Sequence, residues 1–566
     1  MQHNFRYFNR LLWLSMIIFL TKTSQSFGQK VSEILGRPTD KSITVNLLFD
    51  TDVDAYCEWG IASGNYTQQT ANQSFSKSIP VDIDFANLSP NTKYYYRTRY
   101  KTAGMTTYLA GKEHYFNTQK PKGTPFNFIV QADPHMDENS DSLVYDLCMK
   151  NQYLDKADFM VDLGDIFMSE KLPVINYNTI EERVLYMRSF YDLSCHSTPL
   201  LMAMGNHEGE WGYNLNGTEN NITVWDTKLR KIHYPNPYPN SFYSGDTTQY
   251  PFQGVRENYY AFEWGDALFV VLDPFYYTNK KQGNNSWNQT LGEKQYKWFR
   301  STLENSKSKF KFVFSHNLVG GAPSMRGGIE FASLYEWGGL NADGTPGFAN
   351  NRPGWYKPIH DIMVENNVSI YFHGHDHFYA KQDLDCIVYQ LVPQPSYPGY
   401  TKNQAAEYGY LKGDFAANAG HLNISVNADS VKVDYVRTYL PKDENSVRKN
   451  RSISNSYVVK PCVISESNEI KLSNGSLGNN APNPFQNKTN INFSITEKTK
   501  VSISIFDING KLVKKVIDNQ EYTAGDYNVE WDATNQNGSQ INPGVYFYSL
   551  QIEGQSLTKK MINVTY

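Results

Sequence analysis

Cysteine is scarce in this sequence of 566 residues, which has five of them and no Cys-x-x-Cys pair. This scarcity argues against a metal site built on thiolates, because such sites need several cysteines at close spacing. The five residues are spread along the chain, at Cys57, Cys148, Cys195, Cys386 and Cys462. In an exported chain they could form one or two disulfides, and the odd count leaves at least one thiol free.

Long apolar runs are also missing. The longest, Leu11–Leu20, has ten residues, whereas a helix that spans a bilayer needs about 20. Arg6 and Arg10 precede this run, and small residues follow it up to Gly28, which is the pattern of a cleavable secretory signal. We therefore expect residues 1–28 to be a signal peptide that exports the chain through the periplasm, and we expect no transmembrane segment.

Positive charge is not in excess, since 53 Lys and Arg face 57 Asp and Glu, for a net charge of −4. Proteins that bind nucleic acids need a basic surface to neutralise phosphates, so we expect no nucleic-acid partner. Aromatic residues, in contrast, are abundant, with 41 Tyr, 31 Phe and 10 Trp, which favours β-structure. The length exceeds what one hydrophobic core supports, and several domains are expected.

Two patterns divide the chain between residues 30 and 440. Residues 30–119 alternate apolar and polar positions, as in "SITVNLLF" and "KYYYRTRY", which predicts a small β-sandwich. The segment "NLSPNTKYYYRTRY" resembles the corner of fibronectin type III domains, where a Tyr near a strand start bonds the preceding turn. Residues 126–440 alternate short apolar runs with helix-like stretches, the order of an α/β domain.

The end of the chain has a third pattern. Residues 441–478 are expected to form a linker, and residues 479–566 again alternate with period two, which predicts a second β-sandwich. The stretches "PNP", "IFDINGKLV", "WDATNQNG" and "PGVYFYSL" closely resemble the C-terminal sorting domain of type IX secretion cargo in Bacteroidetes. The resemblance implies an export address, with the secretion machinery as partner and a secreted or surface location. A carbohydrate-binding or structural β-module is the alternative.

Acidic, amide and imidazole side chains follow five predicted strands of the α/β domain. "FNFIVQA" leads to Asp133 and His135, "DFMVDLG" to Asp165, "PLLMAM" to Asn206 and His207, "KFKFVFS" to His316, and "SIYF" to "HGHDH", which contains His375 and His377. In open α/β sheets, loops from different strands converge at the carboxyl ends of the strands. The pattern therefore predicts one shared site.

The seven side chains expected to bind metal are Asp133, His135, Asp165, Asn206, His316, His375 and His377. They offer imidazole nitrogens and hard oxygens without sulfur, a set suited to Zn, Mn or Fe. Seven donors exceed one tetrahedral shell, but two ions that share one carboxylate would use them all. Glycines beside the donors, at 164, 205 and 374, would let the backbone turn sharply around the ions.

The blocks "DPH", "GDIF", "GNHE", "FSHN" and "GHDH", in that order, resemble the five motifs of the calcineurin-like metallophosphoesterases. With the preceding β-sandwich, residues 30–440 resemble the purple acid phosphatase branch, whose α/β domain has two sheets flanked by helices. The resemblance places Asp133, His135 and His377 on one ion. It places Asn206, His316 and His375 on the other, with Asp165 as the bridge. His207 corresponds to the family's substrate-facing histidine, which is not a ligand.

One position departs from this pattern. Purple acid phosphatases have a Tyr three residues after the bridging Asp, and its phenolate binds ferric iron, whereas this sequence has Met168 there. The resemblance implies hydrolysis of a phosphoester by a water activated between two cations, with His207 assisting the leaving oxygen. The methionine implies that both cations are divalent, that the enzyme is colourless and that an acidic pH optimum is in doubt.

Other polar residues near these motifs have plainer interpretations. His373 precedes the glycine of "HGHDH" and is expected to pack at the strand end or to support a ligand. Long inserts interrupt the α/β domain near residues 209–256, 275–290 and 320–356, and Arg256, Arg326 and Arg352 flank or lie in them. A guanidinium suits a phosphate, but on such loops it is more often only solvated. Aromatic stretches such as "WGYNL" could line a substrate pocket or form small loop cores.

The leading hypothesis is a secreted dinuclear metal-dependent phosphoesterase, acid phosphatase-like, that acts on small phosphomonoesters. A phosphodiesterase or nucleotidase on the same centre is the near alternative. A third hypothesis is a surface adhesin or glycan-binding protein with an inactive central domain. Inactive scaffolds usually lose ligands, whereas this sequence keeps all seven and His207, which favours an enzyme.

Overall fold

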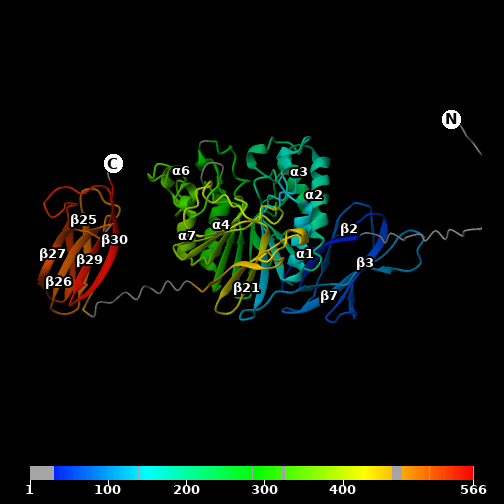
Figure 1. Cartoon of the computed structure of the whole chain (residues 1–566), viewed down its shortest axis with the longest axis horizontal. Coiled ribbons are helices and arrows are strands. Elements are labelled where there is room, and N and C mark those ends of the chain that lie inside the picture. Colours follow the sequence, from blue (N-terminus) through cyan, green and yellow to red (C-terminus); the bar gives the residue numbers. More distant parts are fainter. Residues whose placement is uncertain are drawn as a thin grey trace, which may run out of the picture. The chain divides into compact units, whose positions relative to one another are not determined.

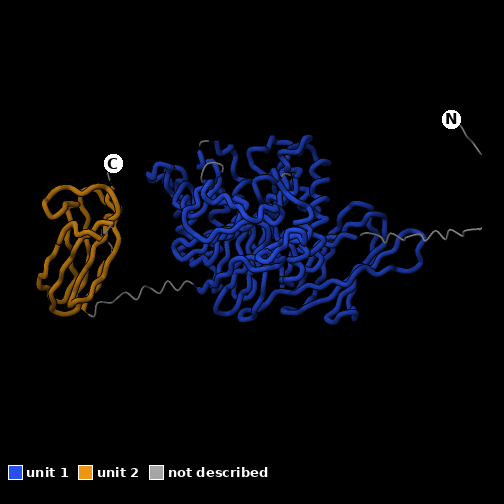
Figure 2. The backbone as a smooth tube through the Cα atoms, in the orientation of Figure 1, with its two compact units in different colours: residues 1–461 blue, residues 462–566 orange. Residues whose placement is uncertain are grey.

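The computed structural model describes residues 31–137, 139–283, 285–321, 325–461, 474–478, 480–508 and 510–564. The expected signal peptide over residues 1–28 lies outside these ranges. The chain divides into two compact units, residues 1–461 and 462–566, which are coloured separately in Figure 2.

A nine-stranded sheet forms one half of the core of the first unit. Its strand order is β23-β22-β21-β10-β11-β12-β1-β2-β6. The strands are β1 (Val31–Gly36), β2 (Ile43–Phe49), β6 (Val81–Phe85), β10 (Phe126–Gln131), β11 (Phe159–Asp162), β12 (Leu200–Met202), β21 (Gly420–Val426), β22 (Val431–Arg437) and β23 (Ile453–Val459). Strands β10, β11 and β12 run parallel, so their carboxyl ends lie at one edge of the sheet.

An eight-stranded sheet forms the other half, in the order β13-β14-β15-β16-β17-β19-β18-β20. The strands are β13 (Ser244–Gly245), β14 (Tyr260–Trp264), β15 (Ala267–Val271), β16 (Phe310–Phe314), β17 (Ile370–His373), β18 (Tyr379–Leu384), β19 (Ile387–Leu391) and β20 (Asp414–Ala416). Strands β15, β16, β17 and β19 are parallel and buried throughout, which explains their continuous apolar sequences.

The two sheets pack face to face, and helices cover their outer faces (Figure 1). Aromatic rings fill the space between the sheets: Phe128 of β10 packs edge-on against Phe269 of β15 at 5.0 Å. Helices α1 (Ser142–Leu154), α2 (Tyr177–Tyr191) and α3 (Ile222–His233) cover the nine-stranded sheet. Helices α4 (Gly292–Asn305), α5 (Tyr335–Gly338) and α7 (Ile359–Glu365) cover the other sheet. The predicted α/β fold, two sheets flanked by helices, is confirmed.

Short helical segments lie in the loops that connect the strands and the longer helices. They are η1 (Ser169–Lys171), η2 (Gly212–Asn214), η3 (Ser286–Asn288), η5 (Ile329–Phe331), α6 (Phe348–Asn351) and η6 (Pro441–Asp443). Most of them fall in or beside the long inserts expected from the sequence. Helix α2 begins at a capping box in which the Asn176 side chain accepts from the Thr179 N–H and the Thr179 side chain accepts from the Asn176 N–H.

Residues 31–117 form two sheets that enclose their own apolar core. Strands β1, β2 and β6 face β3 (Val53–Gly60), β4 (Gln68–Gln69), β5 (Gln73–Phe75), β7 (Lys93–Lys101), β8 (Leu109–Ala110) and β9 (His114–Asn117). Tyr94, at the start of β7, accepts a hydrogen bond from the Ser89 N–H at 2.9 Å, the contact of a tyrosine corner. One sheet of this sandwich continues into the central sheet, because Gly36 of β1 pairs with Leu200 of β12.

The expected linker over residues 441–478 is only partly a linker. Strand β23 lies in this range and pairs with β22 as the outer strand of the nine-stranded sheet. Its sequence, "ISNSYVV", is polar over the first half and lies at a half-exposed edge, so it lacks the apolar alternation of an inner strand. The first unit therefore extends about 20 residues beyond the predicted boundary at 440.

A buried ion pair connects helix α1 to strand β21. His421 Nε2 lies 2.6 Å from an Asp155 carboxylate oxygen, and Arg451 donates to the other oxygen at 2.6 Å. Burial alone would lower the pKa of His421, but the hydrogen bond and charge of Asp155 raise it to about 9. The imidazole is therefore protonated in the folded protein at neutral pH.

This pair predicts a pH-dependent effect of replacing His421 with Gln. Because the folded pKa exceeds the ordinary value of 6.5, the pair contributes fully below pH 6.5 and its contribution is lost as pH rises through about 9. The free energy of unfolding of the variant should fall short of the parent by up to about 3 kcal/mol at pH 6, and by much less at pH 9.5. Urea unfolding at several pH values tests this; a deficit that stays constant with pH would contradict it.

The second unit is a β-sandwich of a three-stranded and a four-stranded sheet. Its strands are β24 (Gly475–Leu477), β25 (Thr489–Ile495), β26 (Thr499–Asp507), β27 (Leu512–Tyr522), β28 (Gly525–Trp531), β29 (Gly544–Ile552) and β30 (Gln555–Asn563). Alternate residues of β25, β26 and β29 point into one core, around the buried Trp531.

Two further expectations concern thiols and membranes. Within the described residues, Cys57, Cys148, Cys195 and Cys386 are free thiols, and the first three are buried; Cys462 falls outside these residues. None of the helices in the described ranges combines the length and the apolar character needed to cross a bilayer.

Candidate metal centre

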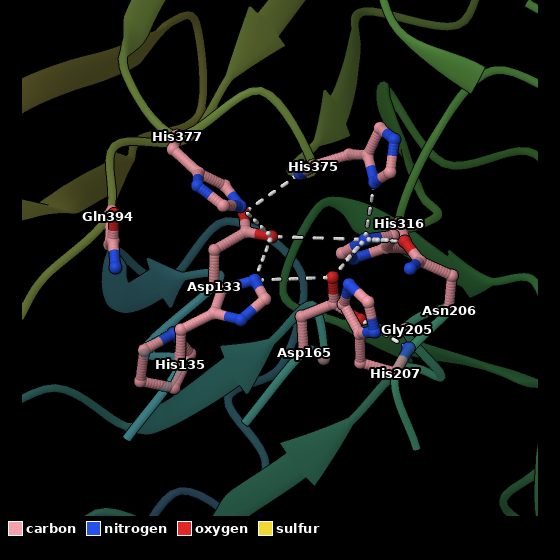
Figure 3. A network of polar contacts seen from close by, with 12 residues as sticks. Asp133, His135, Asp165, Gly205, Asn206, His207, His316, His375, His377 and Gln394 are labelled. Carbon is pink, nitrogen blue, oxygen red and sulfur yellow. Dashed lines mark hydrogen bonds and ion pairs between the residues drawn. The ribbon is translucent and has the colours of Figure 1, made fainter. Parts of the chain in front are cut away.

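The loops after five parallel strands bring the predicted ligands together (Figure 3). Asp133 and His135 follow β10, Asp165 follows β11, Asn206 and His207 follow β12, His316 follows β16, and His375 and His377 follow β17. The first three strands belong to one sheet and the last two to the other. The site therefore lies where the carboxyl ends of both sheets meet, as expected for an α/β fold.

One group of ligand atoms contains Asp133, His135 and His377, whose donor atoms lie within 4.8 Å of one another. Asp133 Oδ1 is 3.8 Å from His135 Nε2 and 3.6 Å from His377 Nε2. Asp133 is kept in place by its second oxygen, which accepts from the His375 N–H at 2.8 Å. These are the three residues predicted to share one ion.

A second group contains Asp165, His316 and His375. His316 Nε2 is at its centre, 3.0 Å from Asp165 Oδ2 and 3.2 Å from His375 Nδ1. The side-chain oxygen of Asn206 lies 3.0 Å from the same nitrogen. The structure thus brings Asn206, His316 and His375 together with the predicted bridging carboxylate.

Asp165 lies between the two groups. Its Oδ2 is 3.4 Å from His135 Nε2 in the first group and 3.0 Å from His316 Nε2 in the second. Its Oδ1 accepts from the His207 N–H at 2.8 Å, which fixes the carboxylate. A single side chain therefore faces both groups, which is the position required of a bridging ligand.

The donor atoms suit bound cations. Within the described residues, three of these buried atoms have no hydrogen-bond partner: Asp133 Oδ1, His135 Nε2 and Asp165 Oδ2. Burying unsatisfied polar atoms costs free energy, and a cation between them would remove that cost. His316 Nδ1 lies 3.0 Å from the Leu163 carbonyl oxygen and donates to it, so Nε2 is the ring nitrogen that would bind a cation.

The charges at the site also favour a bound cation. Burial raises the pKa of Asp133 to about 7, and the negative charge of Asp165 contributes in the same direction. Burial opposes protonation of His316, but Asp165 and Asp133 outweigh it and raise the pKa of this imidazole to about 10. The negative charges of Asp133 and Asp165 therefore stabilise a positive charge in the centre, and they would stabilise a metal cation in the same way.

The backbone at the site is strained. Five of the seven predicted ligands have left-handed backbone angles: Asp133 (φ 58°), His135 (φ 41°), Asp165 (φ 55°), His375 (φ 77°) and His377 (φ 61°). Such conformations are uncommon outside glycine and cluster at functional sites, where the surrounding structure imposes them. The ligand loops therefore adopt backbone conformations that are locally unfavourable and that the surrounding structure maintains.

Two buried carboxylates hold these loops. Glu208 accepts from the Ile166 N–H at 2.8 Å and from the Gly205 N–H at 2.5 Å, and so connects the loops after β11 and β12. Asp162 accepts from the Gly164 N–H at 2.9 Å and from the Tyr191 hydroxyl at 2.7 Å. Both carboxylates therefore orient the loop backbone that carries Asp165, and Glu208 also holds the turn before Asn206.

The close approach of these loops at Gly164 predicts a sensitive position. Gly164 has φ +89°, and a Cβ added there would lie 2.2 Å from the Gly205 nitrogen. Gly217 has φ +79° but no atom within 4 Å of an added Cβ, so it serves as a control of the same backbone conformation. Gly217→Ala should cost about 1 kcal/mol, whereas Gly164→Ala should lower the melting temperature further and reduce metal content. Equal effects in both variants would contradict this.

His207 lies beside the ligands, with its ring 5.3 Å from that of His135. Its Nδ1 is hydrogen-bonded to the Glu170 carboxylate, a partner in η1 that the sequence pattern did not reveal. Burial would lower the pKa of His207, but Asp165 and Glu170 outweigh it and raise that pKa. The imidazole is thus held in one orientation and favoured in its protonated form.

Met168 is buried at the position where the purple acid phosphatases have a Tyr. Its sulfur lies 3.0 Å from Lys171 Nζ, and its backbone N–H donates to Asp137 at 2.6 Å. A thioether offers no phenolate for ferric iron.

The other residues considered from the sequence have structural partners. His373 is buried and stacks on Tyr371 at 5.4 Å, in line with the packing interpretation. Arg256 is buried and pairs with Glu210 at 2.6 Å, and Arg352 pairs with Glu336. These two arginines therefore hold the inserts in place.

Arg326 and Trp211 contact the ligand loops themselves. Arg326 donates to the carbonyl oxygen of His375 at 2.8 Å. Trp211, of the stretch "WGYNL", donates to the carbonyl oxygen of Asn206 at 2.7 Å and stacks on Tyr213. At least one aromatic residue of the inserts thus supports a ligand loop.

The comparisons with known proteins agree with this geometry. The family model "Calcineurin-like phosphoesterase" matches residues 126–379, a range that contains all seven predicted ligands and His207. The chain therefore contains a calcineurin-like phosphoesterase domain. A second model, "Secretion system C-terminal sorting domain", matches residues 481–564 and indicates a secreted or cell-surface protein. No curated protein matches the chain.

Two of the solved structures that the chain matches are informative about its fold. The structure of PhoD is 14% identical with a TM-score of 0.56, over 76% of this chain and 90% of PhoD. Purple acid phosphatase PPD1 from yellow lupin (Lupinus luteus) seeds is 13% identical with a TM-score of 0.52, over 76% of this chain and 74% of that protein. At these identities the likeness shows a metallophosphatase-type fold, and the activity must be inferred from the site.

Proposed function

We propose that this protein is a secreted metallophosphoesterase that binds two divalent cations and hydrolyses small phosphomonoesters. The observation that carries the proposal is the convergence of seven oxygen and nitrogen donors from five strand ends, with three buried donor atoms that have no hydrogen-bond partner among the described residues. The phosphoesterase-domain match over the same residues supports it.

Each residue of the centre has a proposed role. Asp133, His135 and His377 would hold one cation, and Asn206, His316 and His375 the other, with Asp165 shared between them. When bound, such cations neutralise phosphoryl oxygens and lower the pKa of a water molecule that attacks phosphorus. The buried carboxylates and the loops that fix them keep this centre rigid before substrate arrives, which limits the reorganisation needed during reaction.

His207 is proposed to assist departure of the leaving group. Because Nδ1 is hydrogen-bonded to Glu170, the other ring nitrogen is left to donate a proton to the leaving oxygen. The carboxylates of Asp165 and Glu170 favour the protonated imidazole that this role requires. No covalent enzyme intermediate is needed, since water supplies the attacking oxygen.

The cations are proposed to be divalent Fe, Mn or Zn. The donors are nitrogen and oxygen atoms, which these metals accept, and Met168 removes the phenolate that would favour ferric iron. Metal-loaded protein should therefore be colourless. A visible absorption band typical of phenolate-to-iron charge transfer in the loaded protein would contradict this prediction.

The export route is proposed to begin with a signal peptide over residues 1–28 and to end with the type IX secretion machinery, which would recognise the C-terminal sandwich. The sorting-domain match over residues 481–564 supports the second step. The C-terminal sandwich would then serve as an export signal that is removed after secretion, and the mature enzyme would consist of the first unit.

Hydrolysis of nitrophenyl phosphate with and without a chelator tests the proposal. The purified protein should release nitrophenol, lose this activity with the chelator and regain it when Zn, Mn or Fe is returned. A panel of monoesters, diesters and nucleotides would then rank the substrates, and the monoesters should rank first. A well-folded, metal-loaded protein that hydrolyses none of them would overturn the proposal and leave a binding role for the fold.

A further inference from the structure

We propose that Arg326 binds the phosphoryl group at the metal centre and favours dianionic monoesters over diesters; this inference rests on the function proposed above. Arg326 lies in the insert between β16 and β17, outside the strand ends that carry the ligands. Its Nη1 donates to the carbonyl oxygen of the predicted ligand His375 at 2.8 Å. The guanidinium is therefore in direct contact with the loop that carries one ligand of each group, His375 and His377.

Asp376 fixes this arginine from the other side. This residue lies between His375 and His377, its side chain is only 2% exposed, and its Oδ1 accepts from Arg326 Nη1 at 3.1 Å. Its Oδ2 accepts from the Gly327 N–H at 2.8 Å and from the Tyr410 hydroxyl at 2.7 Å. With both oxygens occupied, the carboxylate cannot swing away, and the guanidinium edge that it binds stays beside the ligand loop.

The rest of the guanidinium is available. Its central carbon lies 4.3 Å from the ring of Tyr408, which supports one face, while the side chain remains 28% exposed. Both protein contacts use Nη1, and across the described ranges of the chain Nε and Nη2 have no hydrogen-bond partner. A guanidinium has five N–H donors in a planar fork, so unused donors remain.

The chemistry of the fork suits a phosphate. Two parallel N–H groups match two oxygens of a phosphoryl group, and a charge-assisted pair of this kind is stronger than a neutral hydrogen bond. A monoester has three non-bridging oxygens and up to two negative charges, whereas a diester has two such oxygens and one charge. A guanidinium held beside the metal ligands can therefore bind more oxygen atoms and more negative charge in a monoester than in a diester.

The alternative is a purely structural role, in which Arg326 only secures the insert to Asp376. Arg300 provides a matched control: it pairs with Glu304 at 2.6 Å, lies 3.9 Å over the ring of Tyr356, and its side chain is 37% exposed. Arg300 is on helix α4, so it shares the kinds of contact made by Arg326 but not the place beside the ligands.

The experiment compares R326Q, R326K and R300Q in the full, metal-reconstituted chain. Calorimetry with inorganic phosphate gives affinity without turnover, and kcat/KM for nitrophenyl phosphate and bis-nitrophenyl phosphate gives the monoester-to-diester ratio. R326Q should bind phosphate about 10 to 100 times more weakly, as expected for lost charged hydrogen bonds, and should lower the ratio at unchanged metal content. R326K, which keeps the charge but not the fork, should fall between, and R300Q should match the parent.

The outcomes separate this inference from the proposed function. If the parent protein binds phosphate and hydrolyses esters but R326Q keeps the parent affinity and ratio, Arg326 is structural and the inference is overturned. The inference is also overturned if R326Q melts at a lower temperature and binds less metal while R326K keeps the parental phosphate affinity and monoester-to-diester ratio. If the parent itself neither binds phosphate nor hydrolyses esters, the proposed function fails first.

Discussion

Replacing His207 with Ala should reduce kcat for phosphomonoesters by about 10²- to 10⁴-fold while the protein keeps both cations. The effect should depend on the leaving group. Nitrophenolate departs readily without a proton, whereas an alkoxide does not, so an alkyl phosphate should lose more activity than nitrophenyl phosphate. Steady-state kinetics on the two esters, with elemental analysis of the same samples, measures both quantities.

Two further variants sharpen this result. His360 pairs with the Asp385 carboxylate at 3.0 Å on the outer helix α7, so His360→Ala removes a carboxylate-bound histidine away from the centre and should leave kcat within about twofold of the parent. Glu170→Gln should reproduce part of the His207 loss, with the same dependence on leaving group, because the carboxylate holds the imidazole. An unchanged rate in His207→Ala, or equal losses on both esters, would remove the role assigned to His207.

Replacing Asp165 with Asn should have the other large effect. The amide has nearly the same size but no charge, and one of its two oxygen positions becomes an NH₂ group that cannot bind a cation. Since Asp165 Oδ2 faces both groups of ligands, the variant should lose at least one ion and at least about 10³-fold in kcat/KM.

Asp162 provides the control for this variant. It is equally buried at the end of β11, but its oxygens accept from the protein, including the Tyr191 hydroxyl and the Gly164 N–H. Asp162→Asn should therefore weaken metal binding by only about 10- to 100-fold, the usual effect of a residue that supports ligands. An Asp165→Asn protein with two bound ions and parental activity would refute the bridging role.

The ligands could be predicted from the sequence because each directly follows a short apolar strand. Strands such as "KFKFVFS" are buried on both faces in the structure, and His316 follows at the edge where loops converge. The division between two ions, in contrast, came from the family resemblance, since spacing alone does not say that His377 approaches Asp133 while His375 approaches His316.

The supporting residues could not be predicted in the same way. Glu170 reaches His207 across 37 positions of the chain, and Arg326 reaches His375 across 49, and neither lies in a motif. Such contacts depend on how two loops meet, which no local pattern encodes. The left-handed backbone of Asp133 and His375 is likewise imposed by the surrounding fold, because nothing in the residue type requires it.

The end of the first unit at residue 461 and the continuity of its sheets were not predicted, for a related reason. A single pair, Gly36 with Leu200, joins the N-terminal sandwich to the central sheet, and such long-range pairing leaves no trace in the alternation of β1. Strand β23 is polar because it is an edge strand with one side exposed, so composition alone suggested a linker.

Anomalous diffraction from crystals of active, metal-loaded protein is the most direct test of the central claim. We expect two peaks with the Asp165 carboxylate between them, one beside Asp133, His135 and His377 and the other beside Asn206, His316 and His375. Peaks at other residues, a single peak, or active protein with no peak at this edge of the sheets would contradict the account.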